Sequence, residues 1–211
     1  MNTLEKIQKV GVVPVVALKD AALSVSLAKA LTDGGMPLAE ITFRTDCAEQ
    51  VIADMKRNFP DMLVGAGTVN DKETALKALK AGADFIVSPG LSGGIAQLCR
   101  EKGIAYIPGC VTPTEIMQAL EYGIDTVKFF PAEAEGGLKT IKALAAPFGR
   151  VSFMPTGGIN AANLAEYLSF APVIACGGSW MVENALLEKR DFAEVTARCK
   201  KAVEIARNVK K

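Results

Sequence analysis

Residues 112–131 read TPTEIMQALEYGIDTVKFFP, and this stretch contains both kinds of element from which we expect the whole fold to be built. Its first half has apolar residues at helical spacing. Thr112 can act as N-cap, Pro113 suits the first helical position, and Glu115 lies three residues after the cap, as in a capping box. Gly123 suits the position just after a helix ends. The second half is a short apolar run, so the stretch predicts a helix followed by a buried strand.

The same alternation continues along the chain. DKETALKALKAG at 71–82 and GGIAQLCREKG at 93–103 are further helical patterns that end in glycine. Eight runs rich in Val, Ile and Phe are the expected strands, at residues 10–17, 38–44, 63–69, 85–89, 105–109, 126–131, 152–157 and 173–178. Apolar strands that alternate with helices indicate a parallel sheet with both faces covered. We therefore expect an α/β protein with a (βα)8 TIM barrel, and an open doubly wound sheet is the alternative.

Length and composition limit the number of domains and the class of ligand. The chain has 211 residues, 50% of them hydrophobic, which is enough for one sizeable core. We expect a single domain over residues 1–211, with an N-terminal helix before the first strand. The net charge is +1, and no basic run carries interleaved aromatic residues. This composition argues against nucleic-acid binding and favours a small-molecule ligand.

The cysteines and the N-terminal segment indicate the cellular compartment in which the protein is expected. The five cysteines are odd in number, scattered and free of any C-x-x-C pair, which argues against a disulfide framework and a zinc site. The start MNTLEKIQKVG is charged and amphipathic, unlike a signal peptide, and no apolar run approaches the roughly 18 residues of a membrane-spanning helix. We expect a cytoplasmic protein that does not bind membranes.

Lys128 is an unusual residue for the strand expected at 126–131. Burial of an ammonium group is costly, so a snorkelling side chain, an ion pair and an amine used in chemistry are the alternatives. Side-chain alternation puts Glu40 and Arg44 on one face of the strand expected at 38–44. If these faces turn inward, the three charged groups meet where barrels of this kind carry their active sites. A structural Glu–Arg ion pair is the alternative.

Paired glycines follow the last two expected strands, in PTGGIN at 155–160 and CGGSW at 176–180. Bare backbone N–H groups at a helix N-terminus bind anions, and barrels commonly hold phosphate with the loops after strands seven and eight. With the Ser179 hydroxyl as a further donor, the two loops predict a phosphate site. Tight turns without a ligand are the alternative.

An interior lysine beside a carboxylate suits imine chemistry. The chain has no histidine, which excludes His-dependent triads and metal centres, and no metal or cofactor is expected. A neutral lysine can attack a ketone to form a Schiff base, whose protonated imine allows a neighbouring C–C bond to break or form. Phe129, Phe130 and the charge of Arg44 would favour the neutral amine. We expect Glu40 to transfer protons through water, without direct pairing to Lys128 in the free protein.

Seven motifs, in their order and spacing, resemble the family of 2-keto-3-deoxy-6-phosphogluconate (KDPG) and 4-hydroxy-2-oxoglutarate (KHG) aldolases. They are EITFRT (40–45), GAGTV (65–69), SPG (88–90), PGCVTPTE (108–115), VKFFPAE (127–133), PTGGI (155–159) and GGSW (177–180). The resemblance implies a cofactor-independent class I aldolase that cleaves KDPG to pyruvate and glyceraldehyde 3-phosphate. It also implies a homotrimer.

The resemblance assigns roles to nine residues. Lys128 would form the Schiff base, and Glu40 would be the general acid and base. The residues expected at the pyruvyl end are Arg44, Thr68, Pro89 and Phe130, and those expected at the phosphate are Gly157, Gly158 and Ser179. The segment MVENALLEKRDF at 181–192 departs from the proline-containing segment often found in the family, so the conformation of this loop is open.

Other substrates and functions stay open at this stage. KHG, which would give pyruvate and glyoxylate, and the C4-epimeric phosphogalactonate are alternative aldolase substrates. A phosphosugar isomerase or epimerase on the same barrel would use paired carboxylates and would need no imine-forming lysine. A non-catalytic phosphate-binding module would show no turnover.

Overall fold

The computed structural model describes residues 1–209, and each of the eight expected strands is present. They are β1 (Val12–Val16), β2 (Leu38–Thr42), β3 (Leu63–Gly67), β4 (Phe85–Val87), β5 (Ala105–Ile107), β6 (Thr126–Phe129), β7 (Ser152–Pro155) and β8 (Cys176–Gly178). Several end earlier than expected: β2 stops at Thr42, two residues short of the predicted boundary. The residues beyond the strand ends therefore belong to turns, which matters for the site.

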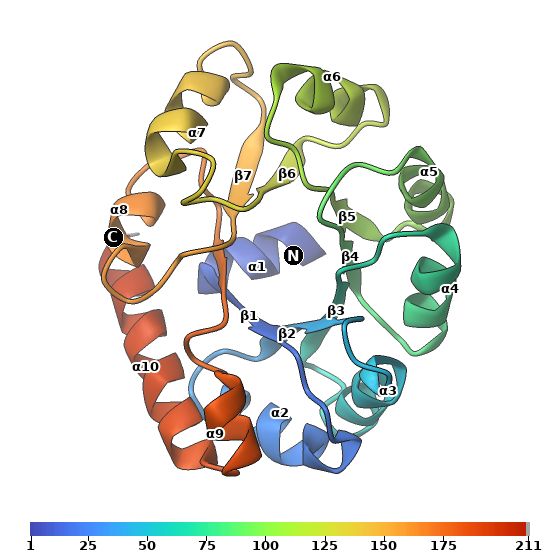
Figure 1. Ribbon diagram of the computed structural model, residues 1–211, viewed down its shortest axis with the longest axis vertical. Helices are drawn as coiled ribbons and strands as arrows, with labels where there is room; N and C mark the ends of the chain where they lie inside the picture. Colours follow the sequence, from blue (N-terminus) through green and yellow to red (C-terminus); the bar gives the residue numbers. More distant parts are fainter. Residues whose placement is uncertain (210–211) are drawn as a thin grey trace.

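Every strand pairing is parallel. Six strands are hydrogen-bonded in the order β5-β4-β3-β2-β1-β8, and β6 pairs with β7. Isolated parallel bridges extend beyond these two groups, between Gly109 and Lys128, Phe153 and Val173, and Thr156 and Gly177. The protein is thus an α/β fold with a curled parallel sheet, and Figure 1 shows its strands around a common centre with helices on the outside.

The helices alternate with the strands, as the sequence pattern predicts. They are α1 (Thr3–Val10), the short 3-10 helix η1 (Ala21–Leu23), α2 (Ser24–Asp33), α3 (Ala48–Asn58), α4 (Lys72–Lys80), α5 (Gly93–Lys102), α6 (Pro113–Glu121), α7 (Gly137–Ala145), α8 (Leu164–Leu168), α9 (Asn184–Glu188) and α10 (Phe192–Val209). The capping box expected at the start of α6 is confirmed, because Thr112 and Glu115 cap each other reciprocally. No helix within residues 1–209 is long and apolar enough to cross a membrane.

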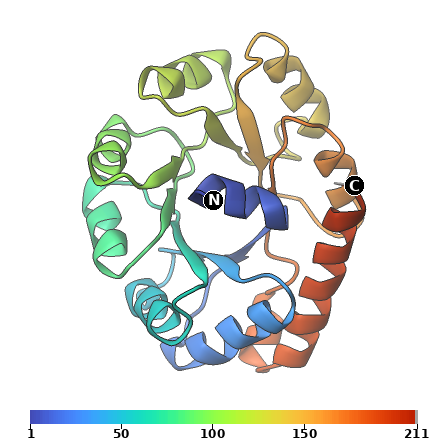
Figure 2. The ribbon, with the colours of Figure 1, turned by 180° about the vertical axis from the view of Figure 1, so that it is seen from behind.

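Helix α1 lies across the N-terminal ends of the strands. It ends at Gly11, whose φ of 80° lets the chain turn directly into β1. Seen from behind, α1 crosses the centre of the ring of strands, in front of them (Figure 2). The opposite end of the sheet, where the strands finish, is therefore the end available for a site.

Several polar side chains are buried on the strands or just after them. Nearly all strand residues are buried and apolar, as expected for a sheet covered on both faces. Among residues 1–209, the buried polar or charged residues other than Ser24 lie on strands or directly after them; they are Glu40, Thr42, Ser88, Thr126, Lys128 and Thr156. Such groups need partners when they are removed from water.

The cysteines are all free thiols, and four of the five are buried. Burial raises the pKa of Cys99 to about 11 and the pKa values of Cys110 and Cys199 to about 12. Since the thiolate is the nucleophile, these three side chains behave as small apolar groups at neutral pH.

Candidate active site

The amine of Lys128 and the carboxylate of Glu40 lie close together in the interior of the protein. Lys128 comes from β6 and Glu40 from β2, and their side chains are 6% and 0% exposed. The distance from Lys128 Nζ to Glu40 Oε1 is 3.5 Å. Direct pairing was not expected in the free protein, and that expectation was wrong. The two strands are not neighbours in the sheet, so the curvature of the sheet brings the groups together.

Glycine on the neighbouring strand makes room for the Glu40 carboxylate. A Cβ atom on Gly67 of β3 would lie 2.1 Å from Glu40 Oε1, far inside van der Waals contact. Glu40 Oε2 is buried and has no hydrogen-bond partner within residues 1–209. One carboxylate oxygen thus faces Lys128, and the other is free to accept a hydrogen bond.

The two phenylalanines that follow Lys128 differ in their exposure to solvent. Phe129, the last residue of β6, is fully buried, whereas Phe130 is 37% exposed. Lys128 Nζ lies 5.0 Å from the centroid of the Phe130 ring. The amine therefore lies between a carboxylate oxygen and an aromatic face, close to the end of its strand.

Arg44 lies just beyond the end of the strand to which it was assigned. The strand ends at Thr42, and Arg44 lies exposed in the following turn. The strand boundary expected at Arg44 was therefore wrong. Arg44 Nε donates to Thr42 Oγ1 at 3.3 Å, and Thr42 Oγ1 donates to the Val16 carbonyl at 2.9 Å. No carboxylate in the described part of the chain pairs with Arg44, so its guanidinium can bind an external anion.

Thr68 and Pro89 each follow the end of a strand. Thr68 comes directly after β3 and has a φ of 57°, a left-handed conformation that is uncommon for threonine and clusters at functional sites. Pro89 lies exposed in the loop after β4. A Cβ on Gly109 would be 1.9 Å from the Pro89 carbonyl oxygen, so this loop packs closely on the strand segment that bridges to Lys128.

The glycine pairs differ from each other. Gly157 and Gly158, with φ of 100° and 81°, form a turn directly after β7, but helix α8 begins only at Leu164. Gly177 and Gly178 are buried residues of β8 itself. The expectation of a glycine loop at a helix N-terminus after both strands was therefore wrong. The candidate phosphate site is therefore reduced to the Gly157–Gly158 turn and the exposed Ser179 that follows β8. The bridge between Thr156 and Gly177 holds these two segments close together.

The glycine turn is fixed by Glu133. The Glu133 N–H donates to the Gly157 carbonyl at 3.1 Å, and Tyr167 donates its hydroxyl hydrogen to Glu133 Oε1. A Cβ on Gly158 would lie 2.3 Å from Glu133 Cγ. A side chain at position 158 would therefore displace Glu133 and disturb the turn as a whole.

Thr156 is a candidate that reasoning from the sequence missed. Its Oγ1 is buried without a hydrogen-bond partner, and Glu40 Oε2 is the other such side-chain atom within residues 1–209. Glu40 belongs to β2, and Thr156 directly follows β7. The available signal was a threonine directly before a glycine pair at a strand end, but its lack of a partner is visible only in three dimensions.

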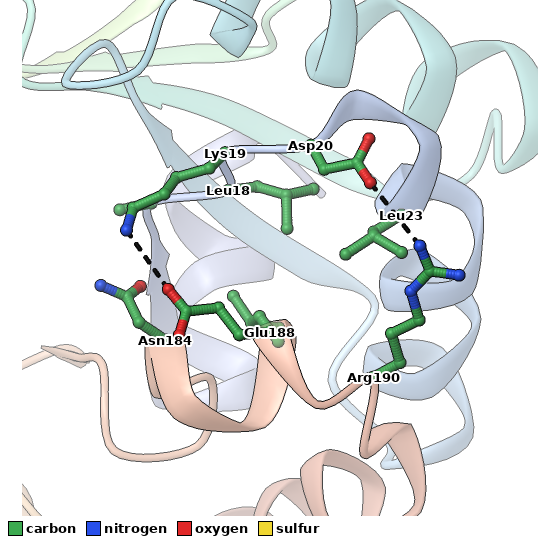
Figure 3. A pocket seen from close by; sticks show the side chains of 9 residues that line it. Leu18, Lys19, Asp20, Leu23, Asn184, Glu188 and Arg190 are labelled. Carbon is green, nitrogen blue, oxygen red and sulfur yellow. Dashed lines mark hydrogen bonds and ion pairs between the residues drawn. The ribbon is translucent and has the colours of Figure 1, made fainter.

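The segment at 181–192 contributes to a separate cavity of about 180 Å³ (Figure 3). Glu188 and Arg190 reach from the region of α9 to the loop after β1, where Lys19 Nζ lies 3.2 Å from Glu188 and Asp20 lies 3.9 Å from Arg190. None of the nine predicted site residues lines this cavity. The ion pairs are exposed and contribute little stability.

No group of three or more Cys, Asp or Glu side chains in the described residues is placed to hold a metal ion.

Comparison with known proteins agrees with the family resemblance of the sequence motifs. Residues 4–198 match the family model described as KDPG and KHG aldolase. A 2-dehydro-3-deoxy-phosphogluconate aldolase from Treponema pallidum is 46% identical over 97% of this chain and 98% of its own length.

Solved structures are similar over the same length. A KDPG aldolase from Legionella pneumophila, with pyruvate captured at low pH as a covalent carbinolamine intermediate, is 35% identical. Its TM-score is 0.92, and the match covers 95% of this chain and 98% of that one. The Zymomonas mobilis ZM4 enzyme with 3-phosphoglycerate is 37% identical, with a TM-score of 0.90 and 95% of both chains covered.

Proposed function

Because this chain belongs to the KDPG and KHG aldolase family, we propose that it is a class I aldolase that cleaves KDPG to pyruvate and glyceraldehyde 3-phosphate. The observation that carries this function is the buried amine of Lys128, 3.5 Å from the buried carboxylate of Glu40. Incubation with KDPG and measurement of released pyruvate test it directly. An isomerase on the same fold would have no use for an imine-forming lysine.

The reaction begins at the ketone. The neutral amine of Lys128 attacks C2 of KDPG to give a carbinolamine, which loses water and becomes a protonated imine. Glu40 is placed to transfer the protons that this exchange requires. Oε1 faces the amine and Oε2 has no partner in the described chain, so the carboxylate can serve both the amine and the substrate.

The carbon–carbon bond breaks next. A base, which we assign to Glu40, removes the proton of the C4 hydroxyl, the C3–C4 electron pair moves toward the imine, and the aldehyde leaves. The resulting enamine takes a proton at C3. Hydrolysis of the imine then consumes the water released earlier, frees pyruvate and restores the amine. No electrons are lost, so the residues named here suffice without a redox partner.

We assign the two ends of the substrate to different loops. Arg44, Thr68, Pro89 and Phe130 would bind the pyruvyl end, and exposure of Arg44 supports its binding to the substrate carboxylate. Gly157, Gly158 and Ser179 would bind the phosphate. The buried hydroxyl of Thr156 lies between these regions in sequence and would find its missing partner in a substrate hydroxyl.

We also infer that the strands close into a (βα)8 barrel and that residues 1–209 form a single domain; residues 210 and 211 of the expected range lie outside the described part of the chain. The isolated bridges support closure, because they lie between β6 and the end of β5 and between the end of β7 and β8. A single contiguous set of buried side chains, drawn from every strand, supports one domain. Assembly as a homotrimer, the cytoplasmic location and cleavage of KHG stay predictions.

Replacement of Glu40 by glutamine should slow KDPG cleavage without loss of the fold. The amide has the shape of the carboxylate but cannot accept and return a proton, so kcat should fall by about 10² or more. Steady-state kinetics and thermal unfolding measure both effects. Glu49→Gln, at an exposed position on α3, is the matched control. An unchanged kcat in Glu40→Gln removes this residue from the mechanism.

Replacement of Arg44 by alanine should weaken binding of the keto acid. A charge-assisted hydrogen bond contributes about 1.5–3 kcal/mol, so KM should rise by at least about tenfold. The control is Arg57→Ala, because Arg57 is also exposed and pairs with Asp54 at 3.2 Å, away from the strand ends. If KM is the same for Arg44→Ala and the parent protein, Arg44 has only a structural role.

A further inference from the structure

The hydroxyl of Tyr106 connects several positions of the loop that carries Pro89. Tyr106 lies on β5 and is 6% exposed. Its hydroxyl oxygen is 2.6 Å from Ser88 Oγ and accepts the Ser92 N–H at 3.2 Å. It also lies 3.3 Å from the Gly90 carbonyl oxygen. One phenol thus contacts the first, third and last residues of the loop at 88–92.

Three further features make this arrangement stable. Ser88 is 1% exposed, and its hydroxyl also donates to the Gly90 carbonyl. Burial raises the pKa of the Tyr106 phenol, so the hydroxyl keeps its proton and can donate. Ser92 is the N-cap of α5, so the far end of the loop is fixed to a helix.

The same loop is packed against the strand segment that holds Lys128. A Cβ atom on Gly109 would lie 1.9 Å from the Pro89 carbonyl oxygen, so there is no space for a side chain at this position. The Lys128 N–H donates to the Pro108 carbonyl at 2.8 Å, and the Cys110 N–H donates to the Lys128 carbonyl at 2.9 Å. The position of Pro89 relative to Lys128 is therefore set from both sides, by the Tyr106 hydroxyl and by the backbone around Gly109.

We propose that Tyr106 is a positioning residue for the pyruvyl end of the substrate, because its hydroxyl holds the loop at 88–92 so that Pro89 stays beside the bound keto acid. The inference rests on the proposed function and adds a residue that does not touch the substrate. It acts on binding of the keto acid and leaves proton transfer by Glu40 unaltered.

Tyr106→Phe is the decisive variant, because it removes one oxygen atom and keeps the ring. The Ser92 N–H and the Ser88 hydroxyl then lose a buried partner, and the loop is free to shift away from Lys128. The pyruvate concentration that gives half-maximal borohydride trapping should rise about tenfold, as should KM for KDPG. Saturated rates should stay within about twofold of the parent protein, since the reacting groups are unchanged.

Tyr122→Phe is the matched control. Tyr122 is the C-cap of α6, and its hydroxyl lies against Gly93 at the start of α5. This hydroxyl makes no hydrogen bond to the loop at 88–92. Its half-saturating pyruvate concentration should equal that of the parent. Inhibition by glyceraldehyde 3-phosphate provides a second readout, because it reports on the opposite end of the substrate and should be unchanged in Tyr106→Phe.

The possible results distinguish a failure of the inference about Tyr106 from a failure of the proposed aldolase function. If Tyr106→Phe binds pyruvate as the parent does, while the parent forms its adduct, the inference is wrong and the aldolase function stands. A fall in kcat at unchanged KM also contradicts it. If Tyr106→Phe does not fold, Ser88→Ala carries the same test, with the same expected rise and the same contradiction. A parent protein that forms no pyruvate adduct contradicts both.

Discussion

Replacement of Lys128 by alanine is expected to abolish both the covalent pyruvate adduct and KDPG cleavage. No other group in the site can form the imine, so kcat should fall by at least about 10⁴, as for removal of a covalent nucleophile in other enzymes. Borohydride trapping with pyruvate and a KDPG cleavage assay measure the two losses independently.

The buried partner of Lys128 requires a second variant. Lys128→Ala leaves the Glu40 carboxylate buried without its cation, and breaking a buried pair in this way costs about 3–5 kcal/mol of stability. Lys128→Arg keeps a cation near Glu40 but cannot form the imine, so it should be better folded and equally inactive. Lys139→Ala and Lys142→Ala on α7 are the matched controls and should retain activity. Turnover in a folded Lys128→Arg protein would exclude the Schiff-base mechanism.

A preference for phosphorylated substrate is the other large expected effect. Two or three charge-assisted hydrogen bonds from the Gly157–Gly158 turn and Ser179 should favour KDPG over the unphosphorylated keto acid by at least about 10³ in kcat/KM. The comparison needs only the parent protein and the two substrates. Equal kcat/KM values would show that these residues serve the turns alone.

A charge placed at Ser179 should separate the two ends of the substrate. Ser179 is exposed and follows β8, so an aspartate fits there, whereas an aspartate at position 158 would collide with Glu133. Ser179→Asp should lose most KDPG cleavage by repulsion of the phosphate and should still form the pyruvate adduct at Lys128. Ser26→Asp, at an exposed position on α2, is the control for added charge. Loss of adduct formation in Ser179→Asp would mean that the two ends are not independent.

The sequence predicted the parts of the fold that depend on local pattern. Apolar runs alternating with helical periodicity located the eight strands, and the residues TPTE located the start of α6. The family resemblance is confirmed by the matched model. Strand ends were less predictable: Phe43 and Arg44 continue the alternating pattern of β2, yet the chain turns at Thr42. An alternating pattern does not show where the strand ends, so the boundary was placed two residues too late.

Contacts between distant segments were the least predictable part of the site. Side-chain alternation predicted that Glu40 and Lys128 would meet in the interior if their faces turned inward, and both are buried. Their direct approach depends on how far the sheet curls, which a linear pattern does not encode. The same holds for Gly67, whose missing side chain accommodates Glu40, and for Glu133, which fills the space beside Gly158.

Peptide mapping by mass spectrometry after borohydride reduction with pyruvate identifies the lysine that forms the imine. We expect one reduced pyruvate adduct per chain, on the peptide that contains Lys128, because this amine is buried beside Glu40 and bordered by Phe130. The other lysines should remain unmodified under the same conditions. An adduct on Lys139 or Lys142 in place of Lys128, or no adduct while KDPG is cleaved, would show that Lys128 does not form the Schiff base.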